Sequence, residues 1–315
     1  MALKDIVNKI SCDAAEVLGT GVKGCDFDFD SLFKIELKPR GTVIPADTTY
    51  NRDYVRLSQQ KGESIWLPDI YDFNWEPEDD QTEVAESTGQ ETVTRRGLYK
   101  LTVMFQKGLY NQKVLESLSG NGIWDAILYD IEGNQFNVTR SDGGIKGLTL
   151  GRFSVSPIQF KKGSSSQKTT AVMQFTKTSQ FGKDLGWISA SELDFNPDEI
   201  DGINQARLSI PVAPSDSDTT FKVKSLLDKD GTHFVEGLTV GNFLVKVNGA
   251  TVTPSGVVAS ASDKDYTFTV SALSTGDVIT VDLYDNTVPS TIIKVGTSPD
   301  EVLYQGKTAT TTVVA

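Results

Sequence analysis

The sequence is poor in the residues that most often build metal and redox sites. It has one histidine, His233, and two cysteines, Cys12 and Cys25, in 315 residues. Two cysteines are too few for a disulfide framework, and two thiols alone do not make a metal site. His233 has no Cys or second His near it in sequence, so we expect a surface or packed imidazole rather than a ligand or a catalytic base. We therefore expect free thiols and no bound metal.

Long apolar runs are also missing. Lys4, Asp5, Asn8 and Lys9 interrupt the segment in which a signal peptide would need an apolar core. No run approaches the roughly 20 apolar residues of a membrane-spanning helix. We expect a chain that folds in a cytoplasm and has no membrane partner.

Motifs that bind nucleotides or activate a nucleophile are absent as well. The GTGVKG run at 19–24 does not open a helix, no Gly-Lys-Ser run occurs, and GIKGLTLG at 144–151 leads into more strand without a nucleophilic serine. Asp26, Asp28 and Asp30 alternate, but phenylalanines fill the spacers of what would be a calcium loop. We expect no catalytic residue and no cofactor. A polysaccharide hydrolase stays open as an alternative, because sequence alone cannot pair carboxylates in space.

The composition is that of a globular protein with an acidic balance. The hydrophobic content is 38%, enough for ordinary cores, and the net charge is −12. Binding nucleic acid by counterion release needs a basic face. DNA is therefore expected only as cargo that passes without specific binding.

The stretch from Gly62 to Gly108 predicts one long hairpin. Its arms, 64–75 and 92–106, mix aromatic or branched residues with polar ones, and the loop at 76–91 has almost no apolar residue. Every ionisable side chain from Glu63 to Glu91 is a carboxylate. Such a run repels itself into solvent, so we expect a tip that is mobile until a partner orders it.

The next segment of the chain has the opposite charge, since residues 95–177 are rich in lysine and arginine. If the two signs lie on opposite faces, identical copies can attract head to tail and form rings or filaments. If they intermix in space, they only keep the protein soluble, and the sequence leaves both readings open. The candidate contacts between subunits are Glu76, Glu78, Asp79, Asp80, Glu83, Glu86, Glu91, Arg95, Arg96, Lys161 and Lys162.

Several further elements are predicted from periodicity. Apolar spacing favours helices at 4–18 and 109–118, and alternation favours a strand at 25–41 with Phe33, Ile35 and Leu37 on its apolar face. Two hairpins are expected, at 123–139 and at 144–178. In the first arm of the long hairpin, Tyr71, Phe73 and Trp75 share one face and Trp66 the other. Such a stripe is typical of a core or subunit interface, and a sugar-stacking platform is the alternative.

The fold class is expected to be mainly β, with two domains. Residues 1–210 would form a β-sandwich or barrel-like assembly domain with a short packing helix. The run IPVAPSDSDTT predicts a linker at 211–218. Short alternating runs in 219–315 predict an Ig-like antiparallel sandwich of seven or eight strands.

Taken together, the long hairpin, the segment LYNQKVLESL, the hairpin from GIKGLTLGRFSVSPIQF to KTTAVMQFTKT and the terminal sandwich resemble the major tail tube proteins of tailed phages. The resemblance is architectural. It implies a non-enzymatic virion protein, assembled in the bacterial cytoplasm, whose copies close into hexameric rings that stack around a DNA channel. It also implies that 76–91 bridges neighbours and that the sandwich lies outside. A capsid decoration, neck, baseplate or fibre protein is an alternative, as is an adhesin whose Ig-like domain binds a host glycan.

Overall fold

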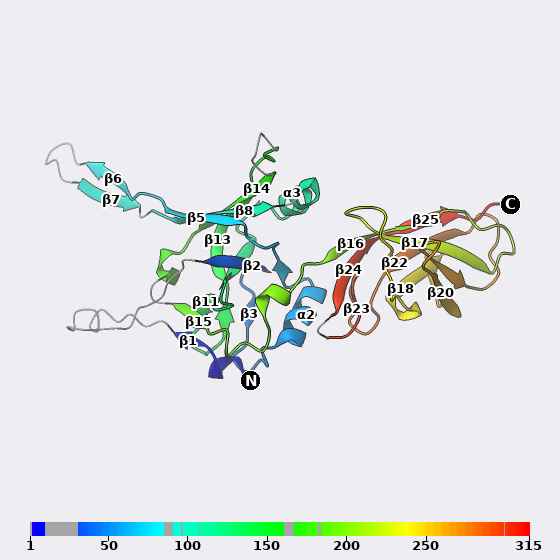
Figure 1. Cartoon of the computed structure of the whole chain (residues 1–315), viewed down its shortest axis with the longest axis horizontal. Helices are drawn as coiled ribbons and strands as arrows, with labels where there is room; N and C mark the ends of the chain where they lie inside the picture. The colour runs from blue at the N-terminus through cyan, green and yellow to red at the C-terminus, as the bar shows by residue number, and fades with distance from the viewer. Residues whose placement is uncertain are drawn as a thin grey trace. The chain divides into compact units, whose positions relative to one another are not determined.

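The computed structural model describes residues 2–9, 31–84, 91–95, 97–106, 108–160, 167–181, 184–298 and 300–315. The fold is mainly β, as the sequence predicted. The chain forms two compact units (Figure 1). Unit 1 comprises Met1–Val55 and Glu63–Asp201, and unit 2 comprises Arg56–Gly62 and Gly202–Ala315.

One branched sheet of thirteen described strands builds unit 1. The strands are β1 (Asn8–Lys9), β2 (Leu32–Pro39), β3 (Val43–Ile44), β4 (Ile65–Trp66), β5 (Asp72–Pro77), β8 (Tyr99–Gln106), β9 (Gly120–Asn121), β10 (Trp124–Asp130), β11 (Gln135–Thr139), β12 (Ile145–Lys146), β13 (Leu148–Val155), β14 (Lys168–Phe175) and β15 (Leu185–Ile188). The main path runs β1-β15-β11-β10-β13-β14-β8-β5, with β2 beside β10 and β4 beside β2. All of these ladders are antiparallel.

One face of this sheet carries the larger core of unit 1. Alternate residues of β8 and β14 point into it, including Leu101, Phe105, Met173 and Phe175. The helix α3 (Gly108–Ser117) packs against β13 and β14. The sequence predicted this helix, and the described part of its apolar stripe is narrower than expected, because Val114 is 39% exposed.

The opposite face of the sheet is also buried, which the sequence did not predict. The expected strand forms as β2, but its second face carries Lys34, Glu36 and Lys38, each no more than 3% exposed. A smaller core that includes Tyr50, Trp66 and Tyr129 covers the charges. The sequence predicted the apolar face of this strand but not the burial of these three charged residues.

These buried charges are satisfied by a hydrogen-bonded network. The Lys38 ammonium lies 2.9 Å from the Glu36 carboxylate, which also accepts hydrogen bonds from Ser64 Oγ at 2.6 Å and the Tyr129 hydroxyl at 3.1 Å. Gln135 Nε2 donates to the hydroxyls of Tyr129 and Tyr50. Burial, together with the nearby Glu36 charge, raises the pKa of both tyrosines well above its usual value. Both hydroxyls therefore stay protonated and able to donate.

The N-terminal region differs from the expected helix at 4–18. Its described part forms a 3-10 helix, η1 (Leu3–Asp5), and then β1, which pairs with β15. The rest of that segment, with Cys12 and Cys25, lies outside the described residues. A helix that the sequence did not predict, α2 (Arg52–Gln60), follows Asn51, whose Oδ1 accepts a hydrogen bond from Tyr54 N at 2.9 Å.

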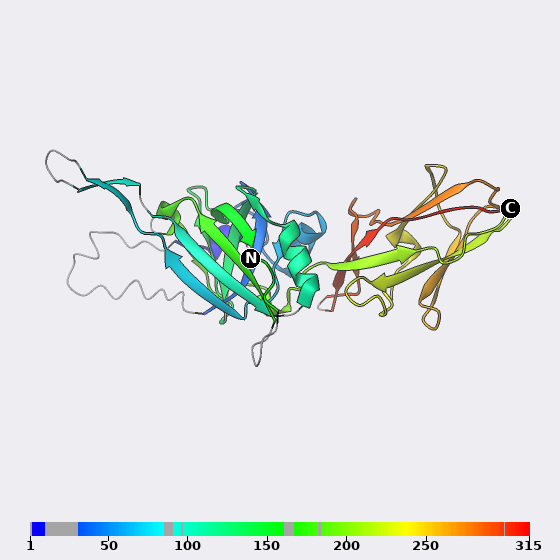
Figure 2. The same cartoon turned by 90° about the horizontal axis from the view of Figure 1, so that it is seen from above.

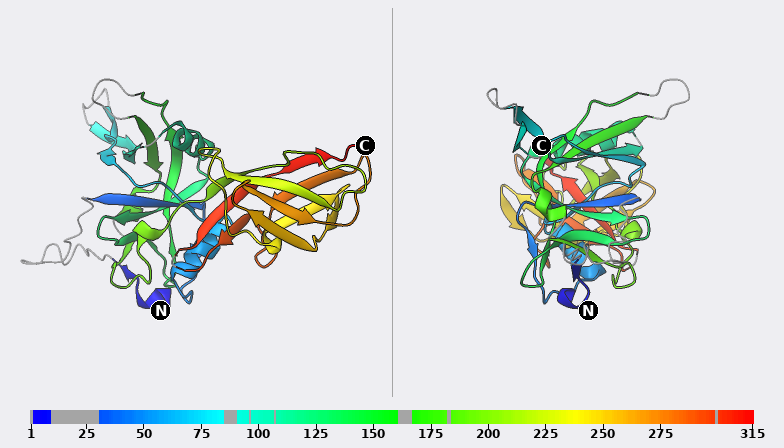
Figure 3. Two further views of the ribbon diagram at one scale, coloured as in Figure 1. Left: turned by 45° about the vertical axis from the view of Figure 1, so that its right-hand side comes forward. Right: turned by 90° about the vertical axis from the view of Figure 1, so that its left-hand side faces the viewer.

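Unit 2 is a sandwich of two sheets. Its strands are β16 (Asn204–Ser209), β17 (Thr220–Leu227), β18 (Phe243–Val247), β19 (Ala250–Val252), β20 (Gly256–Ser260), β21 (Asp265–Thr269), β22 (Val278–Leu283), β23 (Ile292–Val295), β24 (Val302–Lys307) and β25 (Ala309–Thr312). The six-stranded sheet is ordered β20-β21-β17-β16-β24-β23 and the four-stranded sheet β19-β18-β22-β25. Figure 3 shows the strands of this unit, coloured from yellow-green to red. Phe221 and Phe268 from one sheet and Phe243 and Ile279 from the other share one core.

This sandwich departs from the predicted one in two ways. It has more strands than the seven or eight expected, and β16 pairs with β24 in parallel, Asn204 opposite Tyr304. Since β16 belongs to its sheet, the units divide at Asp201 and Gly202, and the linker predicted at 211–218 lies inside unit 2. Short 3-10 helices complete the described chain: η2 (Thr178–Phe181), η3 (Pro197–Glu199) and η4 (Val240–Asn242).

Candidate functional site

The long hairpin is present, but the first arm predicted at 64–75 is not one strand, because β4 pairs with β2 and only β5 pairs with β8. β5 pairs with β8 from Asp72 opposite Met104 to Pro77 opposite Tyr99. Beyond them, β6 (Gln81–Val84) and β7 (Glu91–Arg95) form a second antiparallel ladder. Figures 1 and 2 show this β6–β7 ribbon extending away from the other strands of unit 1. The loop expected at 76–91 is therefore a paired ribbon over much of its length.

Residues 78–80 and 97–98 join the two ladders and are called the neck below. Glu78 N donates to Leu98 O at 2.8 Å, and Gly97 N donates to Asp80 Oδ1 at 2.6 Å. A Cβ atom added to Gly97 would lie 1.6 Å from the backbone oxygen of Glu78. Only glycine allows the two backbones to approach this closely.

The acidic residues at the neck find partners within their own chain. Glu76 accepts from Asn74 Nδ2 at 2.5 Å and lies 3.4 Å from Lys100 Nζ, and Glu78 accepts from Gln174 Nε2 at 2.6 Å. Asp79 is exposed. Glu76, Glu78 and Asp80 therefore each have a partner within unit 1, and their contacts with another copy stay a prediction.

The remaining candidate contacts are placed less fully. Glu83, Glu91 and Arg95 lie on the β6–β7 ribbon. Glu86, Arg96, Lys161 and Lys162 lie outside the described residues. Within the described part of the basic region, Lys168 Nζ lies over the ring of Tyr71, 4.8 Å from its centroid, and Arg140 pairs with Asp142 at 3.1 Å. Here the two signs intermix locally.

β5 is an open edge of the sheet. Among the described strands it pairs with β8 alone. In an antiparallel ladder, every second residue of a strand bonds its backbone to the same neighbouring strand. Glu78 N donates to Leu98 O, so Glu78 points toward the strand that contains β8. Phe73 is an odd number of residues away, and its backbone therefore points away from β8. The backbone of Pro77 also points away from β8, so the N–H that proline lacks would not have bonded to β8. The edge can therefore accept another strand beside Phe73.

The aromatic residues of this arm do not form a sugar-stacking platform. Trp66 is 3% exposed and stacks on Tyr129 with ring centroids 4.8 Å apart. Trp75 is half-buried against Phe175 at 5.5 Å. Of the predicted stripe, Trp75 therefore packs as in a core, whereas Tyr71 is 54% exposed.

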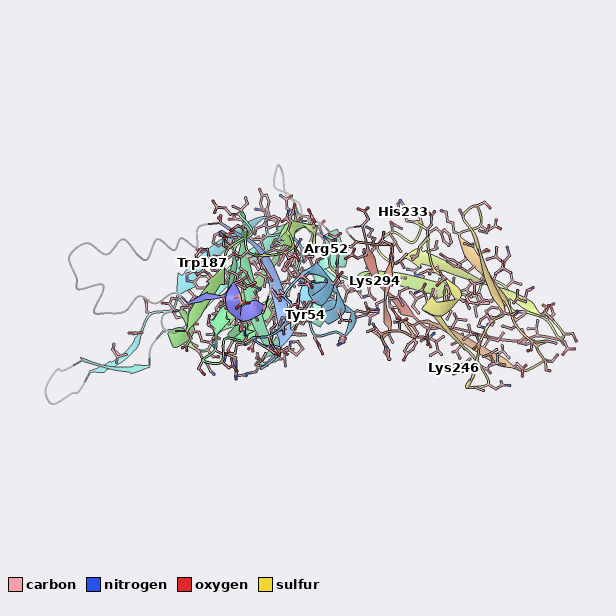
Figure 4. All side chains as sticks on the ribbon, turned by 90° about the horizontal axis from the view of Figure 1, so that it is seen from below. Arg52, Tyr54, Trp187, His233, Lys246 and Lys294 are labelled. Carbon is pink, nitrogen blue, oxygen red and sulfur yellow. The ribbon has the colours of Figure 1, made fainter. Side chains whose placement is uncertain are left out.

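The described residues offer little for catalysis. His233 lies at the surface of unit 2 (Figure 4), and its Nδ1 is 2.5 Å from Asp230 Oδ2. Hydrogen bonds from the backbone of His233 and Thr232 hold the pKa of Asp230 well below its usual range. Within the described ranges, no three His, Cys, Asp or Glu side chains are grouped to hold a metal ion. In that same part of the chain, no helix has the length and apolarity to cross a bilayer.

Unit 1 also has a pocket that the sequence did not predict. Its volume is about 730 Å³, and Phe33 and Phe195 contribute to its lining. Two of its lining residues contact one lysine: Lys34 Nζ lies 3.2 Å from Asp69 Oδ1 and 3.2 Å from Asp198 O. The carboxylates that line it are Asp69, Asp130, Glu132, Asp194 and Asp198. Because carboxylate oxygens accept hydrogen bonds, the pocket is suited to a ligand with hydrogen-bond donors.

Comparison with known proteins places the chain in no established family. No family model matches the sequence, and no curated protein matches it. Among solved structures, one similar chain is a Bacteroides ovatus protein, SGBP-B of a mixed-linkage glucan utilization locus, in complex with a mixed-linkage heptasaccharide. The identity is 12%, the match covers 75% of this chain and 61% of that one, and the TM-score is 0.18. A likeness of this size carries no argument about fold or function.

Proposed function

We propose that this protein is a non-enzymatic structural subunit of a phage virion, a tail tube protein whose copies close into stacked rings. The observation that supports this most directly is the open edge of β5, which continues into the projecting β6–β7 ribbon. Pro77 supplies no N–H at one end of this edge, but the backbone of Phe73 points outward, and a neighbouring copy that supplies a strand there would close the edge.

The charge of the chain supports the same proposal. A net charge of −12 suits a channel through which DNA slides without sticking. In this arrangement unit 1 forms the ring wall, and unit 2 lies outside and contacts other virion proteins. Unit 2 needs no catalytic group for that role.

The proposal is tested on the purified full chain by size-exclusion chromatography and negative-stain microscopy over a range of protein and salt concentrations. We expect rings or tubes whose abundance rises with protein concentration. A compact monomer that is indifferent to both variables would contradict the proposal.

Asp79→Lys is expected to weaken this assembly and to leave the fold intact. Asp79 is exposed at the base of the ribbon, and reversing its charge turns an attraction to a basic neighbour into a repulsion. We expect the concentration for half-assembly to rise about tenfold at low salt, with a smaller difference at high salt. Light scattering measures both. Asp47→Lys makes the same charge change at an exposed site elsewhere on unit 1, and an equal effect there would show that only net charge matters.

Glycan binding is a second candidate, and the pocket of unit 1 favours it. Carboxylates accept hydrogen bonds from sugar hydroxyls, and the rings of Phe33 and Phe195 offer apolar surface. If a glycan array identifies a soluble oligosaccharide ligand, Asp194→Ala should lower its affinity about tenfold by calorimetry. Asp47→Ala should leave the affinity unchanged. The absence of any array signal would remove this candidate.

A further inference from the structure

The strand β20 is an open edge in unit 2. It is the last strand of the six-stranded sheet, and among the described strands it pairs with β21 alone. Figure 1 labels it at the lower margin of unit 2. One of its backbone edges therefore meets solvent.

The hydrogen-bond pattern of β21 shows which backbone groups of β20 point to the open edge. Val270 N donates to Thr219 O at 2.9 Å, so the backbones of Phe268 and Tyr266 point from β21 toward β17. Val257 and Ala259 lie opposite these two residues. Their N–H and C=O groups therefore point away from β21, toward the open edge.

Between Gly256 and Ser260 this edge carries no charged residue and no proline, and Pro254 lies two residues before the strand. Residues 247–262 contain no Asp, Glu, Lys, Arg or His, although the chain as a whole is 23% charged. Natural edge strands commonly carry a lysine, a proline or a bulge within the strand. β20 reads Gly-Val-Val-Ala-Ser, and Val258 is 67% exposed. It is an uncharged, apolar template for another strand.

We propose that β20 pairs with β20 of a second copy of this chain, antiparallel and about a two-fold axis at Val258. Val257 then faces the partner's Ala259, and Ala259 faces the partner's Val257. Each pair exchanges two backbone hydrogen bonds, which joins two six-stranded sheets into one. Val258 lies opposite the partner's Val258 in a pair without hydrogen bonds, with Cα atoms about 4.5 Å apart.

A second copy is the occupant that the charges favour. Two chains of net charge −12 repel each other over most of their surface, but the 247–262 stretch adds no like charge at the contact. The nearest charge after it, Asp263, pairs with Lys222 at 3.3 Å. A two-fold axis also places valine on valine, which covers apolar surface on both copies. The contact uses unit 2 only and does not depend on the ring contact proposed for unit 1.

The test uses the full chain with Cys12→Ser and Cys25→Ser, so that one introduced thiol reports the contact. Val258→Cys should form a disulfide-linked dimer on mild oxidation, because the Cα separation falls within the range that a disulfide spans. Val278→Cys is the matched control, since Val278 is a 41% exposed valine on the other sheet. We expect about ten times more cross-linked dimer from Val258→Cys. Equal yields from the two variants would overturn the proposal.

A proline variant separates strand pairing from chance collision. Ala259→Pro removes an N–H that points to the open edge and leaves the bonds to β21 in place. In the Val258→Cys background it should abolish the cross-link, with unit 2 still folded by circular dichroism. If this variant does not fold, Val258→Glu in the chain without the introduced cysteine serves instead and is read by sedimentation, since like charges directly opposite each other oppose pairing. A native dimer mass by sedimentation that survives in the folded variant would contradict the inference.

Discussion

Glu36→Ala is expected to destabilise unit 1 by about 3–5 kcal/mol, the cost of removing one partner of a buried ion pair. Glu36 and Lys38 are both 1% exposed, and their charged groups are 2.9 Å apart. The substitution leaves the Lys38 ammonium buried without that carboxylate. It also takes the acceptor from Ser64 Oγ and the Tyr129 hydroxyl. Urea unfolding followed by tryptophan fluorescence measures the loss, because Trp66 stacks on Tyr129.

Two comparisons make this result specific to the buried charge. Replacing both residues, as Glu36→Leu with Lys38→Met, should cost less than Glu36→Ala, since no uncompensated charge remains. Glu63→Ala removes an exposed carboxylate and should change the stability by no more than about 0.5 kcal/mol. If Glu36→Ala is as stable as Glu63→Ala, the network does not hold the second face of the sheet together.

Gly97→Ala is expected to abolish assembly into rings or tubes while unit 1 stays folded. The added Cβ would lie 1.6 Å from Glu78 O, and a backbone atom cannot move aside as a flexible side chain can. The neck must open, which breaks the hydrogen bonds to Asp80 and Leu98 and misdirects the β6–β7 ribbon. Negative-stain microscopy should show loss of particles, and limited proteolysis should show faster cleavage within 78–97.

Gly241→Ala is the matched control for this change. A Cβ at Gly241 meets Thr239 Oγ1 at 3.8 Å, an ordinary contact, so assembly should be unaffected. Circular dichroism and thermal unfolding show whether Gly97→Ala keeps the core of unit 1. If the folded variant assembles like the unaltered protein, the ribbon is not an assembly element and the proposal for unit 1 loses its main support.

The hairpins were predictable because their signal is local. β8 and β14 alternate buried and less buried residues along their length, and this period of two is visible in the sequence. The hairpin predicted at 123–139 forms as β10 and β11. Such patterns depend only on neighbours within a few residues.

The candidate site was predicted in part for the same reason. The hairpin at 62–108 and its acidic character are local properties, so its arms and its projection from the sheet could be expected. The partners of Glu76 and Glu78 could not, because Lys100 and Gln174 lie far along the chain. The pocket was missed altogether, since its lining comes from segments near 33, 69, 131 and 195.

The sequence by itself determined the mainly β character and the alternation of the strands, because these follow from the chemistry of neighbouring residues. Only the tertiary structure decided that β2 is buried on both faces, that β16 joins the second unit and that β5 and β20 end their sheets with open edges. Whether a strand face meets a core or solvent, and whether a strand edge has a neighbour, depends on segments distant in sequence. That information is absent from any local pattern.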